Sequence, residues 1–268
     1  MSTALTLDQA LEPVRADPAR SAVLLDVDGT LAPIVRHADD AHVPEPTRGI
    51  LIRVARAYAV TACVSGRRAA VARRIVSIGS ISYVGNHGGE LLRSGRTEPE
   101  LSPEWAAGGQ RVREFERSVW DDPALARLRV RREDKGEIAA LHWRGAPDEQ
   151  AAERAVRAIA ERAEAAGLAI HWGKKVLEVR PAVPVDKGAG IAWLLKSSPE
   201  ARAALYVGDD TTDLDAFRGL RSLVAEGRLD SAVCVGVRSD ETPPDLEREA
   251  DVLVDGPPGV RSVLEALL

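Results

Sequence analysis

The sequence is poor in aromatic side chains and in cysteine, and it carries no excess of basic charge. Aromatic residues make up 4% of the 268 residues and hydrophobic residues 45%, so a core must be built mainly from aliphatic side chains. The formal net charge of −5 provides no basic surface for nucleic acid. The two cysteines, Cys63 and Cys234, lie in separate apolar runs without a C-x-x-C motif, which is typical of buried thiols in a reducing compartment.

Features of several other protein classes are missing as well. No apolar run approaches the length that crosses a membrane, and Met1–Leu5 does not begin a basic region followed by a long apolar stretch. We therefore expect a cytoplasmic protein without a membrane partner, and we favour a monomer. The motifs H-E-x-x-H, G-x-S-x-G and G-x-x-x-x-G-K-[ST] are absent, which disfavours zinc peptidases, serine hydrolases and P-loop NTPases.

Short apolar runs alternate with helical patterns over both ends of the chain. This alternation predicts an α/β fold, with a Rossmann-like, mostly parallel sheet covered by helices on both faces. Right-handed crossovers then place the carboxyl ends of the strands at one edge of the sheet. The apolar runs are Ala22–Val27, Tyr58–Val64, Ile81–Gly85, Ala204–Val207, Ala232–Val237 and Val252–Val254.

The middle of the chain has a different pattern. After Pro99 and Pro103, a long amphipathic stretch, a hairpin, a second helix and two short strands follow one another up to Pro181. This order predicts a small α+β domain, residues 105–183, inserted into a discontinuous core domain of residues 1–104 and 184–268.

Two acids, Asp26 and Asp28, follow the first apolar run directly. Carboxylates at i and i+2 of a strand point to the same side, and Gly29 allows the chain to turn there. Two such charges repel each other unless a cation or a proton lies between them. The same dipeptide also fits an ordinary surface turn, so the pair alone does not decide for chemistry. A calcium loop is disfavoured because its twelfth position holds His37 instead of Glu.

Three further polar clusters follow strands or begin helices of the core. Ser65-Gly66-Arg67 offers a hydroxyl and backbone amides to an anion, Asp186-Lys187-Gly188 offers a cation, and Gly208–Asp213 offers more carboxylates. Each cluster alone equally fits a capped helix start or an exposed lysine. Together, at one sheet edge, they predict metal-assisted phosphoryl transfer, with Mg²⁺ as the cofactor and a carboxylate as the phosphate acceptor.

The order D-x-D-G-T-L, S-G-R, a lysine that begins a helix and G-D-D-x-T-D resembles the haloacid dehalogenase superfamily of phosphatases. Within it, four segments resemble the trehalose-6-phosphate phosphatases, and the resemblance extends from about residue 20 to 265. These segments are residues 26–34, 85–88 (G-N-H-G), 141–144 (L-H-W-R) and 173–181 (G-K-K-V-L-E-V-R-P).

The resemblance implies roles for the core residues. Asp26 would be the nucleophile that accepts the phosphoryl group, and Asp28 would protonate the leaving oxygen and then activate water. Ser65, Gly66 and Lys187 would hold the phosphate.

The resemblance also implies a Mg²⁺ site formed by Asp26, Asp209 and Asp28, the last through its main-chain carbonyl. Asp213 would be a further ligand or a support for the others. The family commonly has a Glu where this chain has Leu214, so no supporting carboxylate is expected at that position.

For the inserted domain, the resemblance implies a mobile cap that excludes water and positions a sugar. The candidate sugar contacts are His87, Arg144, Lys175 and Glu178. The implied activity is Mg²⁺-dependent hydrolysis of trehalose 6-phosphate to trehalose and phosphate through an aspartyl-phosphate intermediate. Alternatives are a phosphatase for another phosphosugar, such as sucrose phosphate or a mannosyl phosphoglycerate, a non-catalytic sugar-phosphate sensor, and a mutase-type phosphoryl transfer.

Overall fold

The computed structural model describes residues 5–35, 40–119, 121–173, 175–240 and 242–268. The chain divides into two compact units, one of Met1–Glu100 with Val185–Leu268 and the other of Leu101–Pro184. The sequence placed the divisions after residues 104 and 183. The independence of the two parts as domains stays a prediction. Each unit is described separately below.

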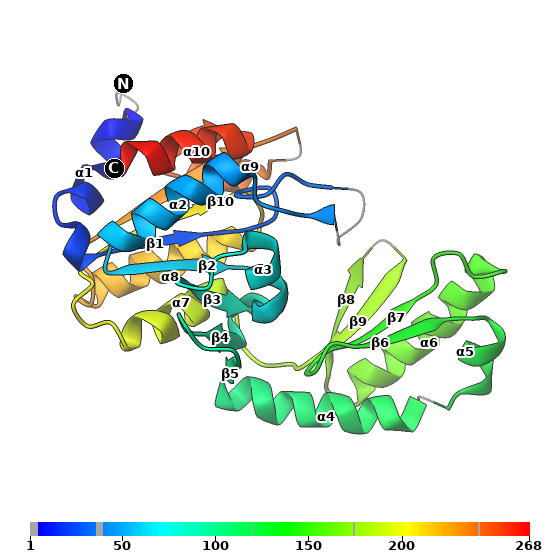
Figure 1. Ribbon diagram of the computed structural model, residues 1–268. Coiled ribbons are helices and arrows are strands. Elements are labelled where there is room, and N and C mark those ends of the chain that lie inside the picture. The colour runs from blue at the N-terminus through cyan, green and yellow to red at the C-terminus, as the bar shows by residue number, and fades with distance from the viewer. Residues whose placement is uncertain (1–4, 36–39, 120, 174, 241) are drawn as a thin grey trace. The chain divides into compact units, whose positions relative to one another are not determined.

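The larger unit contains an eight-stranded sheet in the order β12-β11-β10-β1-β2-β3-β4-β5 (Figure 1). The pairings from β12 to β3 are parallel, whereas β4 pairs antiparallel with β3. The predicted parallel sheet is therefore confirmed. The strands are β1 (Ser21–Leu25), β2 (Val60–Val64), β3 (Ser82–Gly85), β4 (Glu90–Leu92), β5 (Glu100–Leu101), β10 (Ala203–Gly208), β11 (Ser231–Arg238) and β12 (Val252–Asp255).

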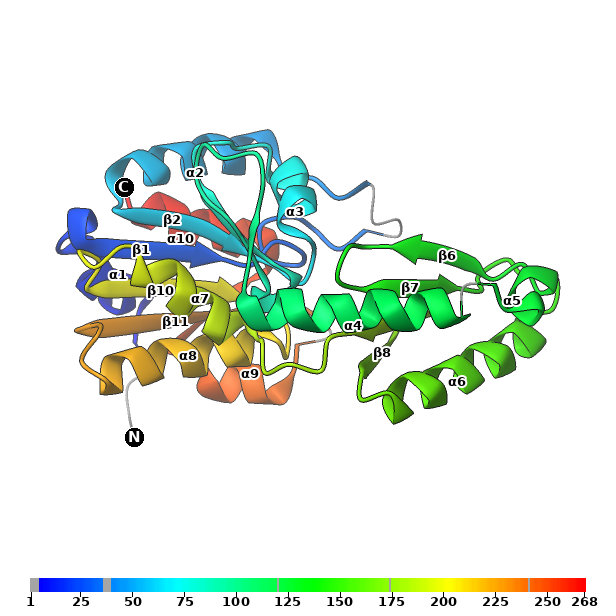
Figure 2. The same ribbon diagram turned by 90° about the horizontal axis from the view of Figure 1, so that it is seen from below.

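Helices cover both faces of this sheet, which is why its central strands are buried throughout. All five residues of β1 are buried, with Val23 and Leu25 on one face and Ala22 and Leu24 on the other. One face packs against α1 (Leu7–Arg15), α2 (Glu45–Ala57), α3 (Ala69–Val76) and α10 (Gly256–Ala266). The other packs against α7 (Lys187–Lys196), α8 (Asp213–Ala225) and α9 (Pro244–Glu249) (Figure 2).

The three central strands, β10, β1 and β2, lie side by side and run in the same direction. Their carboxyl ends therefore meet at one edge of the sheet, as the alternating pattern predicted. Asp209, Asp26 and Ser65 follow directly after these strands, so the topology brings segments far apart in the sequence to one place.

The smaller unit is an antiparallel sheet in the order β6-β7-β9-β8. One sheet face packs against α4 and α6 through alternating apolar residues such as Leu141 and Leu177. The α+β composition predicted for the inserted segment is present. Its elements are α4 (Pro103–Val119), α5 (Pro123–Arg127), β6 (Arg131–Asp134), β7 (Ala139–His142), α6 (Glu149–Ala165), β8 (Ala169–Gly173) and β9 (Val176–Arg180).

Within the described ranges, none of the helices combines the length and the apolar character of a membrane span. Both cysteines, Cys63 and Cys234, are buried free thiols, as their apolar surroundings in the sequence predicted.

Candidate active site

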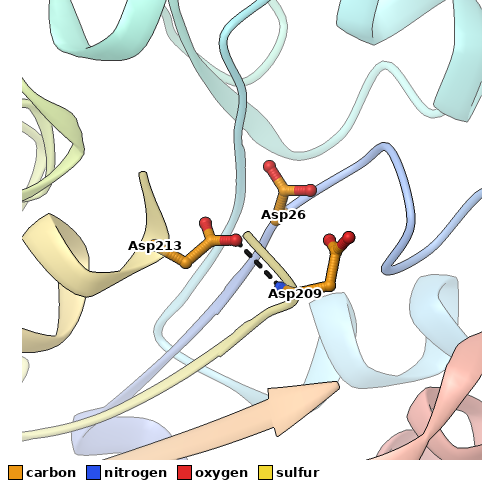
Figure 3. Close-up of side chains that lie close together, drawn as sticks. All are labelled: Asp26, Asp209 and Asp213. Carbon is orange, nitrogen blue, oxygen red and sulfur yellow. Dashed lines mark hydrogen bonds between the residues drawn. The ribbon is translucent and has the colours of Figure 1, made fainter. Parts of the chain in front are cut away.

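Three carboxylates meet at the carboxyl edge of the large sheet. Asp26, Asp209 and Asp213 each place one oxygen within 4.8 Å of the others (Figure 3). Asp26 comes directly after β1, and its N–H still donates to Val207 of β10 at 2.9 Å, which fixes its backbone. All three are buried, with 5, 8 and 0% of their surface exposed.

Lys187 lies between two of these acids. Its Nζ donates to Asp26 Oδ1 at 2.7 Å and to Asp213 Oδ1 at 2.6 Å, and only 3% of the residue is exposed. Burial lowers the pKa of Lys187, but the two acids raise it by more, so the amine stays charged. Three carboxylates and one ammonium then leave a formal charge of −2, which is the charge that a divalent cation neutralises.

Asp213 is held by four donors. Its Oδ1 accepts from Lys187 and from the Tyr206 hydroxyl at 2.6 Å. Its Oδ2 accepts from the N–H of Asp209, the bond drawn in Figure 3, and from the N–H of Asp210, both at 2.9 Å. A Cβ at Gly208 would lie 2.3 Å from Asp213 Cγ, so this close approach requires glycine. With both oxygens already paired, Asp213 is suited to support its neighbours and less to bind a metal itself. Tyr206 gave no signal in the sequence, because it lies within an apolar strand.

Asp209 and Asp26 each keep one oxygen without a hydrogen bond from the part of the chain that the structure describes. Asp209 Oδ1 accepts from Thr30 Oγ1 at 2.8 Å, which leaves Oδ2, and Asp26 uses only Oδ1. Burial raises the pKa of Asp209 to about 6, with a smaller contribution from Asp213 and an opposing one from Thr30. Burial also raises the pKa of Asp26, against the effect of Lys187. Two unpaired carboxylate oxygens in a group of charge −2 fit a hard cation such as Mg²⁺.

Asp28 lies apart from this group. The sequence suggested that Asp26 and Asp28 are two positions of one strand. The strand ends at Leu25, so both acids lie beyond it. The Asp28 carboxylate accepts from Arg67 Nε and Nη2, each at 2.7 Å, and its side chain is 37% exposed. Arg67 therefore neutralises Asp28 while Lys187 neutralises Asp26. A metal contact through the Asp28 main-chain carbonyl stays a prediction.

Gly29 makes the turn directly after Asp28 possible. Its φ is +85°, and a Cβ there would lie 2.0 Å from Asp209 Oδ2. We expect Gly29→Ala to lower the phosphoryl-transfer activity that the sequence predicts by about 100-fold, because the added methyl group must displace a carboxylate of the site. Gly95→Ala is the matched control, since Gly95 has a φ of +73° but nothing within 4 Å of its Cβ position. Equal effects of the two substitutions on activity would show that only backbone strain matters.

Ser65, Gly66 and Arg67 form a turn before α3 and do not begin the helix. The helix starts at Ala69, two residues later than the S-G-R pattern indicated, and its N-cap residue Arg68 makes no side-chain cap. Ser65 Oγ accepts from the N–H of Arg67 at 3.1 Å, and the N–H of Gly66 has no acceptor among the described residues. A hydroxyl and a free amide remain available at this turn, as a phosphate-binding loop needs.

His87 lies against this turn and belongs to the larger unit. Its ring lies against Gly66, where a Cβ would be 2.6 Å from His87 Nε2. The structure thus groups His87 with the predicted phosphate residues, whereas Arg144, Lys175 and Glu178 lie in the smaller unit.

Two of the three candidate sugar residues of the smaller unit, Lys175 and Glu178, pair with charged side chains. Lys175 Nζ donates to Glu149 Oε2 at 2.5 Å. Glu178 accepts from Lys135 Nζ at 2.9 Å and also from Arg180. Burial raises the pKa of Glu178, but Lys135 and Arg180 lower it by more. The resulting pKa is about 2, so the carboxylate stays ionised. Sequence reasoning did not identify Glu149 or Lys135. Arg144 follows β7, and Lys174 of the 173–181 segment lies outside the described residues.

A family model and a curated relative both point to one family. The family model described as trehalose-phosphatase matches residues 24–247. A curated trehalose-phosphate phosphatase of Mycobacterium marinum is 35% identical over 206 residues, which are 74% of this chain and 51% of that protein. This chain thus spans about half the length of that relative.

Solved structures share the fold. The C-terminal domain of a Candida albicans trehalose-6-phosphate phosphatase matches with a TM-score of 0.68 and 22% identity, covering 100% of this chain and 98% of that one. A haloacid dehalogenase-like hydrolase from Bacteroides thetaiotaomicron matches with a TM-score of 0.61 and 15% identity, covering 92% and 99%.

Proposed function

Because the chain belongs to the trehalose-phosphatase family, we propose that it is a Mg²⁺-dependent phosphatase that hydrolyses trehalose 6-phosphate to trehalose and phosphate. The observation that carries this proposal is the buried group of Asp26, Asp209, Asp213 and Lys187 at the end of three parallel strands. A structural or binding protein has no need to bury three acids so close together, because their burial and mutual repulsion destabilise the fold. The monomeric state and the cytoplasmic location stay predictions from the sequence.

In this proposal, Asp26 is the nucleophile. A bond forms between an Asp26 carboxylate oxygen and phosphorus as the bond from phosphorus to the sugar oxygen breaks, and Asp28 gives its proton to that oxygen. Water then loses a proton to Asp28, attacks the phosphorus of the aspartyl phosphate and releases phosphate and Asp26. The Asp28 side chain reaches solvent, and Arg67 must release one of its two oxygens before that oxygen carries the proton.

The remaining residues bind and orient. Ser65 Oγ and the Gly66 amide would hold the phosphate oxygens, and Lys187 fixes the Asp26 side chain and supplies positive charge. Asp26 and Asp209 would hold the metal, with the Asp28 carbonyl completing the protein ligands and Asp213 supporting both Lys187 and the Asp209 loop. When bound, Mg²⁺ would offset the repulsion between an anionic nucleophile and a phosphate dianion.

The smaller unit would act as the cap that selects the sugar. Arg144, Lys175 and Glu178 offer charged hydrogen-bond donors and acceptors for sugar hydroxyl groups, and His87 would act from the phosphate side.

A panel of phosphosugars, assayed for phosphate release, tests the proposal. We expect the highest kcat/KM on trehalose 6-phosphate, no activity in excess EDTA and recovery with Mg²⁺. Faster turnover of sucrose phosphate or a mannosyl phosphoglycerate would assign that compound as the substrate. An isomerised sugar phosphate as product would indicate a mutase. Binding of trehalose 6-phosphate without phosphate release would indicate a sensor.

The raised pKa of Asp209 makes Mg²⁺ binding depend on pH. With a pKa of about 6, most Asp209 side chains are ionised at pH 7.5 and most are protonated at pH 5.5. Because the proton competes with the metal, we expect the apparent affinity for Mg²⁺ to fall by about fourfold between these pH values.

Thermal unfolding with and without Mg²⁺ measures this effect. The folded, metal-free chain binds this proton more tightly than the unfolded chain, so Asp209 destabilises it least at low pH and most above pH 6. The rise in unfolding midpoint on adding Mg²⁺ should therefore be larger at pH 7.5 than at pH 5.5. The Asp209→Asn variant serves as the comparison. If Mg²⁺ raises the unfolding midpoint equally at both pH values in the wild type, as it does in this variant, Asp209 is not a metal ligand.

A further inference from the structure

The segment that follows β3 has an unusual backbone. Asn86 and His87 have φ values of +48° and +54°, so two consecutive residues with side chains adopt the left-handed conformation. This conformation costs free energy for residues other than glycine and persists only where the surroundings hold it.

The side chain of Glu90 holds this turn. Glu90 is the first residue of β4 and is 1% exposed. Its Oε1 accepts from Asn86 Nδ2 at 2.9 Å, and its Oε2 accepts from the N–H of Ala69 at 2.7 Å. One buried carboxylate thus joins the left-handed turn to the first residue of α3 and supplies the cap that Arg68 does not provide.

The left-handed turn also holds the loop that carries Ser65 and Gly66. The N–H of Asn86 donates to the carbonyl of Arg67 at 2.8 Å, and the N–H of His87 donates to the carbonyl of Ser65 at 3.1 Å. The His87 ring lies so close to Gly66 that a Cβ there would be 2.6 Å from its Nε2, so any other residue would have to displace the ring. Glu90 is therefore linked to both ends of the Ser65–Arg68 loop, directly at Ala69 and through Asn86 and His87.

We propose that Glu90 is a positioning residue for phosphate binding, which acts through the left-handed Asn86–His87 turn that seats the His87 ring on Gly66. This inference rests on the proposed function, in which Ser65 and Gly66 hold the phosphate. Without the Glu90–Asn86 bond, the loop would populate its binding conformation less often, and the apparent affinity for phosphate would fall in proportion.

The polarity of the Glu90–Asn86 hydrogen bond provides a test. Glu90→Gln removes a carboxylate that accepts from Asn86 and from the N–H of Ala69 and that also pairs with Arg68 Nε at 3.5 Å. Asn86→Asp places two acids face to face. Combining the two substitutions reverses the bond, because the amide introduced at position 90 can donate to the carboxylate introduced at position 86. The oxygen of that amide still accepts from the N–H of Ala69. Asn and Asp both tolerate the left-handed conformation.

The readout is the dissociation constant of inorganic phosphate, measured by calorimetry in the presence of Mg²⁺, together with the unfolding midpoint. We expect each single substitution to raise the dissociation constant by about tenfold, and the double variant to return within about threefold of the wild type. Glu137→Gln is the matched control. It changes another buried glutamate, which pairs with Arg113 in the smaller unit, and should leave phosphate binding unchanged.

Single variants that lower only the unfolding midpoint, or a double variant that does not recover phosphate binding, would overturn the inference. If the Glu90 variants do not fold, His87→Asn serves instead, because it keeps the left-handed backbone and removes the ring; unchanged phosphate affinity there would also overturn it. Calorimetry needs no turnover, so a wild-type chain that binds phosphate but hydrolyses no phosphosugar would contradict the proposed function alone. A wild-type chain that binds no phosphate would overturn this inference.

Discussion

Replacing Lys187 with alanine is expected to lower the free energy of unfolding of the metal-free chain by about 3–5 kcal/mol. Lys187 is 3% exposed and is the direct partner of both Asp26 and Asp213. Without it, two buried carboxylates lose their compensating charge, and the group carries −3 instead of −2. Phosphate release should fall as well, by about 100-fold or more, because the amine both orients the nucleophile and stabilises developing negative charge.

Metal addition separates the electrostatic effect from a simple packing defect. Because the group in Lys187→Ala is more negative, Mg²⁺ should raise the unfolding midpoint of this variant by more than it raises that of the wild type. Lys196→Ala is the matched control, since Lys196 ends the same helix and is exposed. Its unfolding free energy should stay within about 0.5 kcal/mol of the wild type. An equally small change in Lys187→Ala would contradict the account of the site.

The sequence was sufficient to predict the residues that topology brings together. Asp26, Ser65 and Asp209 each end an apolar run, and parallel strands necessarily bring such positions to one edge. Lys187 was predictable because Asp186 is a side-chain N-cap, and it does accept from the N–H of Ala189 at 2.8 Å. These predictions combine local signals in the sequence with the right-handed crossover of parallel strands.

The contacts that refine the site were not predictable, because they join residues distant in the sequence. Thr30 donates to Asp209 across 179 positions, and Arg67 pairs with Asp28 across 39. No periodic pattern in the sequence predicts either pair.

The start of α3 shows the same limit. The S-G-R pattern suggested a helix start at Arg67, but the helix begins at Ala69, and the acceptor for its first N–H is Glu90, 21 residues further along the chain. The short strands β4 and β5 were missed because three and two residues are too few to show an alternation of apolar and polar positions.

The largest effect on activity is expected from Asp26→Asn. If Asp26 is the nucleophile, the amide cannot form the aspartyl phosphate, and phosphate release should fall by roughly 10⁴-fold or more. The fold should tolerate the change. Lys187 keeps its contact with Asp213, and a neutral side chain at position 26 removes a carboxylate whose pKa is raised by burial and by the neighbouring acids. The metal-free unfolding free energy should therefore fall by no more than about 1 kcal/mol.

Asp210→Asn is the matched control for this substitution. Asp210 neighbours the same group but is exposed, and among the residues that the structure describes its carboxylate accepts only from Thr211. Its turnover should stay within about threefold of the wild type, since the amide oxygen can still accept the same bonds. Folding should be checked by thermal unfolding, and substrate binding by calorimetry with trehalose 6-phosphate. A folded Asp26→Asn variant that binds this ligand without releasing phosphate would assign the lost step to chemistry. Full phosphate release by that variant would exclude covalent catalysis at Asp26, and with it the reason for burying three acids at the edge of this sheet.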